Sequence, residues 1–336
     1  MTRSLAQVAY GPYQTENDIY SLAMSVPWHE RFELTRTIRV DVTATKSPLT
    51  SLDFVALRLK DAICDRFRDE TGKRPDVNTR DPDVRVAGFL TETHVTLYLD
   101  LSGEPLFKRG YRNEAGGAPL KENLAAGIIA LTGWQHDEPF LDPMCGSGTL
   151  VLEAAMMALG VAPGSGRTFG FERLSDFDAK LWQQLRDEAR AGEAPHRPLT
   201  IFGSDVNPRE VERAKAVAVR AGLAEVVTFT RGDMTEIARP AASGVMVANP
   251  PYGVRLGERE MLDALYPRLG AALKSRFSGW RCYFFTGDLQ LPRLVRLKES
   301  KRTPLFNGTI ECRLFEFKMV AGSNRKPEAN EIPSTP

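Results

Sequence analysis

The residues best suited to chemistry are Asn249-Pro250-Pro251-Tyr252, which directly follow the apolar run Val245–Ala248. Their types suit the binding of a planar amine at the end of a buried strand. The Asn249 side-chain oxygen and the Pro250 carbonyl can each accept one N–H. Pro251 stiffens the loop, and Tyr252 can stack on the ring that carries the amine. The same residues also fit an ordinary loop in which two prolines stop the strand.

A second candidate site is the turn after Phe140–Asp142, which reads Pro143-Met144-Cys145-Gly146-Ser147-Gly148-Thr149 and opens a helix. Backbone N–H groups at a helix N-terminus favour an anionic ligand group, whereas Asp142 favours an ammonium. The methionine part of S-adenosylmethionine presents one group of each sign. The turn matches neither the dinucleotide GxGxxG pattern nor a P-loop. A purely structural strand–helix turn remains the alternative.

Two further carboxylates, Asp205 and Asp233, end the next predicted strands. Asp205 is placed to accept hydrogen bonds from both ribose hydroxyls, as in dinucleotide-binding folds. Asp233 is placed to accept from an adenine amino group. We assign Asn207 to capping of the following helix, which has Pro208 at its first position. Polar groups thus follow several successive parallel strands at their carboxyl ends, where open α/β sheets bind ligands.

The elements that must position these residues are strands separated by helices, which predict a mostly parallel sheet. We expect an antiparallel hairpin at its end, because Asn307-Gly308 is a strong turn signal. A helix over 124–131 precedes the sheet, and residues 322–336 are polar and Pro-rich, which predicts disorder. The predicted strands are Pro139–Asp142, Leu199–Asp205, Val226–Asp233, Val245–Asn249, Arg281–Thr286, Thr303–Phe306 and Thr309–Val320.

A separate α/β module precedes this sheet. We expect a strand through 38–42, a helix capped by Thr50 or Ser51 and ended by Gly72, and strands over 84–90 and 94–101. The predicted apolar stripe of the helix is Phe54, Leu57, Ile63 and Phe67. Residues 1–30 form no regular pattern beyond a short helix at 18–24 that Pro27 ends.

Two segments suggest contacts with nucleic acid. Lys108, Arg109 and Arg112 surround Tyr111, so that cations could follow a phosphate backbone while the ring stacks on a base. A solvated basic linker explains the same pattern equally well. Arg255, after the Asn249 loop, could add a further cation. The Gly-rich insertion at 162–172 and the helix 177–191, with Leu181, Trp182 and Leu185 on one face, favour a packing element over a lid or an RNA contact.

Composition limits the function classes. The net charge is +1, so that nucleic-acid binding must come from local patches. Cys64, Cys145, Cys282 and Cys312 are scattered without a CxxC pair, which predicts neither a zinc site nor a disulfide framework and fits a reducing compartment. No signal pattern or membrane-spanning apolar run is present in the sequence given. We therefore expect a cytoplasmic protein.

The motifs together resemble a known family. DPMCGSGT (142–149), GSD (203–205), GDM (232–234) and NPPYG (249–253) look like those of Rossmann-like amino-methyltransferases, and the preceding module resembles a THUMP RNA-binding domain. Residues 100–103, 109–112, 119–122 and 169–172 extend the resemblance to the RlmL-type 23S rRNA guanine-N2 methyltransferases, over roughly residues 15–320. The part that normally completes the THUMP unit on its N-terminal side is expected to be missing or cut short.

The resemblance implies an α/β protein with a Rossmann-like class I methyltransferase domain at 113–321, a THUMP-like domain at 1–112 and a disordered tail at 322–336. It implies S-adenosylmethionine as methyl donor, S-adenosylhomocysteine as product, and no metal. The expected partner is 23S rRNA or the assembling large subunit, with no membrane and no obligate protein partner. The cofactor residues it implies are Lys121, Glu122, Asp142, Pro143, Cys145, Gly146, Ser147, Gly148, Thr149, Asp205, Asp233 and Asn249.

Other functions fit the same residues. Methylation of guanine N2 in tRNA or of adenine N6 in DNA would use the same Asn-Pro-Pro-Tyr chemistry, and the THUMP-like module favours RNA. A non-catalytic RNA-binding or ribosome-assembly factor would keep the fold. The retention of Asp142, Asp205, Asp233 and Asn249 counts against that alternative.

Overall fold

The computed structural model describes residues 2–112, 120–251 and 258–320, with side chains from residue 262 onward in the last range. These residues divide into two compact units. The first contains the chain up to residue 112 together with 121–123 and 160–194, and the second contains the remainder. A segment inserted into the sequence of the second unit therefore belongs structurally to the first.

The first unit is built on a four-stranded sheet in the order β1-β4-β3-β2. Strands β2 (Ile38–Ala44), β3 (Val84–Leu90) and β4 (His94–Asp100) occur where the sequence predicts them. The parallel pair β2–β3 requires a crossover, which helix α3 (Leu52–Thr71) supplies. Ser51 caps α3 by accepting from the Phe54 N–H at 3.3 Å, and Gly72 ends it with φ of 74°.

The N-terminal segment is more regular than its sequence suggests. Strand β1 (Leu5–Pro12) pairs antiparallel with β4, and helices α1 (Glu16–Met24) and α2 (Trp28–Arg31) follow. The expectation of an irregular beginning is therefore wrong. The strand is hard to recognise because it lies at the sheet edge and nearly all of its residues are exposed or half-exposed, so that it lacks a clear apolar alternation.

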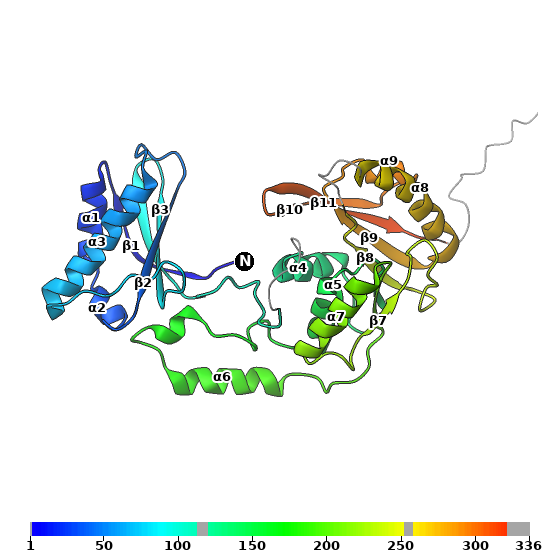
Figure 1. The fold of residues 1–336 in the computed structure, drawn as a ribbon, viewed down its shortest axis with the longest axis horizontal. Coiled ribbons are helices and arrows are strands. Elements are labelled where there is room, and N and C mark those ends of the chain that lie inside the picture. Colours follow the sequence, from blue (N-terminus) through cyan, green and yellow to red (C-terminus); the bar gives the residue numbers. More distant parts are fainter. Residues whose placement is uncertain (1, 113–119, 252–257, 321–336) are drawn as a thin grey trace, which may run out of the picture. The chain divides into compact units, whose positions relative to one another are not determined.

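The predicted apolar stripe of α3 is only half correct. Phe54 and Leu57 are 49% and 53% exposed. The buried stripe instead begins at Val55 and continues through Leu59 and Ile63. These positions are four residues apart and share one helix face, whereas Phe54 lies outside that face. Figure 1 shows α1, α2 and α3 on one side of the sheet.

The second unit is a seven-stranded sheet in the order β10-β11-β9-β8-β5-β6-β7. The strands β5 to β9 run parallel, and the hairpin β10–β11 runs antiparallel to them. The predicted mostly parallel sheet with a terminal hairpin is confirmed. The bounds are β5 (Phe140–Asp142), β6 (Ile201–Asp205), β7 (Thr228–Arg231), β8 (Gly244–Ala248), β9 (Trp280–Thr286), β10 (Lys301–Asn307) and β11 (Ile310–Lys318).

Helices cover both faces of this sheet. Figure 1 shows α4 (Glu122–Thr132), α5 (Thr149–Leu159) and α7 (Pro208–Arg220) on one side. Helices α8 (Glu258–Arg276) and α9 (Leu291–Leu294) lie on the other. There Leu269 and Leu273 of α8 share a buried cluster with Met246 of β8 and Phe284 of β9. Within the described ranges, no helix is long and apolar enough to cross a membrane.

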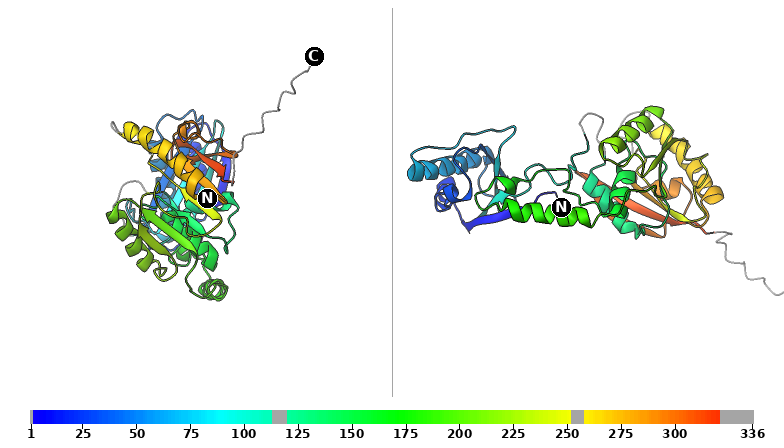
Figure 2. Two further views of the ribbon diagram at one scale, coloured as in Figure 1. Left: turned by 90° about the vertical axis from the view of Figure 1, so that its right-hand side faces the viewer. Right: turned by 90° about the horizontal axis from the view of Figure 1, so that it is seen from below.

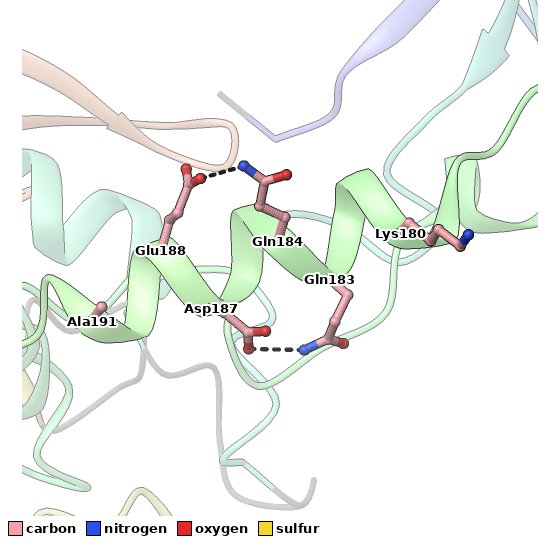
Figure 3. Close-up of a pocket in the computed structure, with 6 residues that line it drawn as sticks. All are labelled: Lys180, Gln183, Gln184, Asp187, Glu188 and Ala191. Carbon is pink, nitrogen blue, oxygen red and sulfur yellow. Dashed lines mark hydrogen bonds between the residues drawn. The ribbon is translucent and has the colours of Figure 1, made fainter.

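The 160–194 insertion contains a short 3-10 helix, Gly170–Arg173, and the helix α6 (Ala179–Ala191). Helix α6 buries none of its residues, and Figure 1 and the left view of Figure 2 show it apart from the four-stranded sheet of its unit. Figure 3 shows that Gln183 and Gln184 each donate to the carboxylate one turn later, at 2.9 and 2.8 Å. Such pairs stabilise an exposed helix locally. Leu181 is 52% exposed, so the predicted apolar face does not pack as a whole.

Candidate active site

The candidate site lies along one edge of the seven-stranded sheet. Strands β8, β5, β6 and β7 are consecutive parallel neighbours, so their carboxyl ends meet at the same edge. Neighbouring strands lie about 4.8 Å apart, and the row of four ends therefore spans about 14 Å. The chain reverses its direction of winding between β5 and β8, and such a switch point is where ligands bind in open α/β sheets.

Asp142 ends β5 at the centre of this row and is only 2% exposed. One of its oxygens accepts from the Met144 N–H at 3.1 Å. Burial raises the pKa of Asp142 to about 8, because the charged form loses hydration; the Met144 N–H opposes this and the nearby charge of Asp205 adds to it. A carboxyl group in this state favours a cationic ligand group that restores its charge.

Asp205 ends β6 and holds the turn after β5. Its Oδ2 accepts from the Gly146 N–H at 3.0 Å, and its Oδ1 accepts from the Asn207 N–H at 2.9 Å. The Cys145 N–H donates to the Ser204 carbonyl at 2.9 Å, which adds a second link between the two segments. Asn207 caps α7 as predicted, by accepting from the Arg209 N–H at 3.0 Å. Both Asp205 oxygens are therefore fixed at the sheet edge.

Gly148 of the turn and Gly203 of β6 make room for Phe229, a residue of β7 that no sequence motif indicated. Gly148 has φ of 82°, and a Cβ at that position would lie 2.8 Å from the Phe229 ring. A Cβ at Gly203 would lie 2.6 Å from the same ring. Side chains at either position would push the turn and the ring apart. The sequence signals that could have indicated this contact are the glycines of the GSGT and GSD motifs.

The turn between β5 and α5 contains the other predicted cofactor residues of this segment. Pro143 and Cys145 are buried, Gly146 and Ser147 are half-buried, and Thr149 begins α5. Burial raises the pKa of the Cys145 thiol, with the charges of Asp142 and Asp205 adding to the effect. Cys145 is therefore protonated at neutral pH and suits a packing role.

Asp233 lies two residues beyond β7, which ends at Arg231 and is shorter than predicted. Its Oδ1 accepts from the backbone N–H and the hydroxyl of Thr235, both at 2.8 Å. Arg268 of α8, which no sequence motif indicated, approaches the other oxygen at 3.7 Å. Burial alone would raise the pKa of the Asp233 carboxyl. The Thr235 hydrogen bonds and the Arg268 charge together have the larger effect, so that the pKa is lowered. Asp233 is thus held ionised.

Asn249 directly follows β8, the neighbour of β5. Its Oδ1 atom is buried and, among the described residues, has no hydrogen-bond partner. Pro250 is buried and Pro251 is exposed. An amide oxygen that has lost water without gaining a partner costs free energy, which a ligand N–H would recover. Tyr252 and Arg255, predicted to stack on a base and to bind RNA, lie outside the described residues.

The remaining predicted site residues belong to the first unit. The Lys121 ammonium lies 5.0 Å from the centre of the Phe107 ring. Glu122 is 5% exposed and lies 3.5 Å from the Arg112 guanidinium. Tyr111 is 7% exposed, so its ring is not presented for stacking in this structure. That part of the predicted RNA contact needs correction, because the ring is packed inside the protein.

Lys108 is exposed and pairs with Glu104, and Arg109 donates to the Leu106 carbonyl at 3.3 Å.

No cluster of three or more His, Cys, Asp or Glu side chains that could hold a metal ion occurs in the ranges with described side chains.

Comparison with family models agrees with this architecture. Residues 109–316 match the RMKL-like methyltransferase domain, and residues 13–100 match the THUMP domain. The chain is 43% identical over 325 residues to a ribosomal RNA large subunit methyltransferase K/L of Psychromonas ingrahamii, covering 95% of this chain and 43% of that protein. The same enzyme of Aeromonas salmonicida is 40% identical, over 91% of this chain and 45% of its own length.

Solved structures share the fold across both units. SMU.472 in complex with SAH has a TM-score of 0.87 and 30% identity, covering 96% of this chain and 85% of that one. A predicted N6-adenine-specific DNA methylase from Listeria monocytogenes has a TM-score of 0.85 and 31% identity, covering 95% and 82%. TrmN from Thermus thermophilus, at 20% identity and a TM-score of 0.68, shares the fold alone, over 95% of this chain and 83% of that one.

The chain spans less than half the length of the curated relatives, 43% and 45% of the two named above. The matched methyltransferase domain nevertheless covers more than half of the chain, and the sheet order is that of class I methyltransferases. The protein therefore belongs to the RMKL-like methyltransferase family and carries a THUMP domain ahead of its methyltransferase domain.

Proposed function

We propose that this protein transfers a methyl group from S-adenosylmethionine to the exocyclic N2 amine of a guanine in large-subunit (23S) ribosomal RNA. The curated relatives are named ribosomal RNA large subunit methyltransferases, which supports the RNA class. The choice of guanine N2 rests on the resemblance of the sequence motifs. The protein would act in the cytoplasm, on rRNA or on the assembling large subunit.

The observation that carries this proposal is the buried Oδ1 of Asn249, which has no hydrogen-bond partner among the described residues and lies beside the strand that ends in Asp142. The residues present fit the methyl donor in charge. Asp142 would bind its ammonium group, Asp205 its ribose hydroxyls and Asp233 its adenine amine. The half-buried backbone of Gly146 and Ser147 would meet its carboxylate at the start of α5. The sequence resemblance adds Lys121 and Glu122 to the proposed cofactor residues.

When bound, S-adenosylmethionine supplies a methyl group activated by the positive sulfur. The exocyclic amine is a weak nucleophile, because its lone pair is delocalised into the ring. Asn249 Oδ1 and the Pro250 carbonyl would each accept one amine N–H, which turns the lone pair toward the methyl carbon. The amine would lose one proton to solvent as it takes up the methyl group. Catalysis is thus positioning and electrostatics.

The target base must be unpaired or flipped out of its helix, because the edge of a sheet cannot reach an amine inside a duplex. The THUMP domain would bring the RNA to the enzyme, with Lys108 and Arg109 as phosphate contacts. Tyr252 would stack on the base and Arg255 would help to hold the RNA.

Identification of the methylated nucleoside tests the proposal. The protein is incubated with isotope-labelled S-adenosylmethionine and with total RNA from cells that lack the modification, and the RNA is digested for mass spectrometry. We expect label in N2-methylguanosine of large-subunit RNA. Label confined to N6-methyladenosine would contradict the choice of base. Tight binding of the methyl donor without any transfer would instead favour an RNA-binding factor.

The pKa of Asp142 gives a prediction about cofactor binding. Because this pKa is raised to about 8, Asp142 is largely protonated at neutral pH, and binding of an ammonium group requires its ionisation. We expect the affinity for S-adenosylmethionine to rise about tenfold per pH unit between about pH 6 and pH 8, and then to level off. Calorimetry in two buffers of different ionisation enthalpy should show proton release on binding.

Asp142→Asn is the matched variant, because it keeps the shape of the side chain and removes the titration. It should bind the cofactor more weakly, with an affinity that no longer follows this pH dependence. The folding stability of the unliganded protein changes with pH in the opposite direction to the cofactor affinity. The neutral Asp142 side chain stabilises the fold below about pH 4, and this stabilisation is lost as the pH rises toward 8. A cofactor affinity of the wild type that does not change over this range would refute the role of Asp142.

A further inference from the structure

Arg167, in the 160–194 insertion, contacts a segment far away in the sequence. Its Nη1 donates to the carbonyl oxygens of Pro105 at 2.7 Å and Lys108 at 3.3 Å. Its Nη2 donates to the carbonyl oxygens of Ser102 at 2.8 Å and Glu104 at 2.5 Å. One guanidinium therefore links four carbonyls of residues 102–109, which we call the basic turn because it ends in Lys108 and Arg109.

The backbones of the two segments are also in close contact. Gly110 has φ of 96°, and a Cβ there would lie 2.4 Å from the Gly166 carbonyl oxygen. A Cβ at Gly170 would lie 2.6 Å from the Asp100 carbonyl oxygen. The Arg167 guanidinium is further held against Phe169, at 4.9 Å from the ring centre. The glycines of the insertion thus let Arg167 reach the basic turn.

Only arginine has the donors for this arrangement. Its planar fork carries five N–H groups, whereas a lysine ammonium is a point charge with three. Without Arg167 the four carbonyls would turn to water, and residues 102–109 would regain conformational freedom that must be lost again on binding. Preorganisation of this kind strengthens binding without any new contact to the ligand.

We infer that Arg167 is a positioning residue for RNA binding, which fixes the basic turn so that Lys108 and Arg109 present their charges to RNA phosphates together. The inference deepens the proposed function and rests on its RNA substrate. It also gives the Gly-rich insertion a role, because the insertion acts as the support of the basic turn rather than as a separate RNA contact.

The salt dependence of RNA binding separates positioning from direct contact. Each phosphate contact with single-stranded RNA adds about 0.7 to the slope of log Kd against log salt concentration. We expect Arg167→Ala to weaken binding of a fluorescently labelled large-subunit rRNA transcript about tenfold with an unchanged slope. The Lys108→Ala, Arg109→Ala double variant should lower the slope by about 1.4. Arg167→Lys should restore part of the affinity.

Two further measurements complete the test. Arg167→Ala should raise the KM for RNA while the kcat at saturating RNA and the Kd for S-adenosylmethionine stay unchanged, which also shows that the variant is folded. Arg190→Ala is the matched control. It removes an exposed arginine of the same insertion, which lies 3.9 Å from Asp187, and should change neither affinity nor slope.

Three outcomes would overturn the inference. Unchanged RNA affinity of Arg167→Ala would show that the basic turn needs no support. A slope lowered by about 0.7 in that variant would make Arg167 an RNA contact itself. Unchanged binding of the Lys108→Ala, Arg109→Ala double variant, with methyl transfer intact, would remove the basic turn from RNA recognition and leave the methyltransferase proposal standing. Failure to bind or transfer from S-adenosylmethionine at all would instead refute the proposed function.

Discussion

Asn249→Ala is expected to lower methyl transfer by orders of magnitude while cofactor binding stays nearly intact. Its Oδ1 is buried and has no partner in the described part of the chain, which leaves it available for an amine N–H of the target base. Loss of one positioned polar group in an active site lowers kcat by about 10²- to 10³-fold. Single-turnover transfer to RNA measures this loss, and calorimetry measures the affinity for S-adenosylmethionine.

Two variants sharpen that measurement. Asn249→Asp keeps an acceptor oxygen at the same place and should retain more transfer than Asn249→Ala. Gln184→Ala removes an amide from the exposed helix α6 and should leave transfer unchanged. If Asn249→Ala loses cofactor affinity as strongly as it loses transfer, Asn249 would be a cofactor residue and the division of roles proposed above would fail.

Asp205→Ala should produce the largest loss of cofactor affinity. Its two oxygens accept from the Gly146 and Asn207 N–H groups, so that the side chain shapes the turn. Asp205 is also the proposed acceptor of the ribose hydroxyls. A hydrogen bond to a charged group contributes about 1.5–3 kcal/mol. Loss of the two hydrogen bonds proposed between Asp205 and the ribose hydroxyls corresponds to a loss of S-adenosylmethionine affinity of about 100-fold or more. Equilibrium dialysis with labelled S-adenosylmethionine measures the change.

The matched control for this prediction is Asp137→Ala, which removes an exposed carboxylate from the same unit and should bind the cofactor like the wild type. Asp205→Asn keeps one acceptor oxygen and should fall between the wild type and Asp205→Ala. RNA affinity should be equal in all of these variants, because Asp205 is proposed to bind the cofactor and not RNA. A cofactor affinity of Asp205→Ala close to that of the wild type would show that the ribose binds elsewhere.

Local patterns predicted much of the fold. The strands of the large sheet were recognised from short apolar runs, and the hairpin from Asn307-Gly308, because both depend on neighbouring residues. Strand β1 was missed, since a half-exposed edge strand has little alternation. The buried face of α3 was predicted incorrectly near its start, because Phe54 and Leu57 are apolar yet exposed.

For the site, local sequence patterns were enough to predict that Asp142, Asp205 and Asn249 lie at strand ends, and the parallel order brings those ends to one edge. The partners that hold these residues became known from the three-dimensional fold. The Gly146–Asp205 hydrogen bond joins residues 59 positions apart, and Arg167 reaches Ser102 across 65 positions. Tyr111, whose ring was expected to stack on a base, is instead buried by tertiary packing. Such contacts depend on how distant segments pack, and no local pattern of residue types encodes that packing.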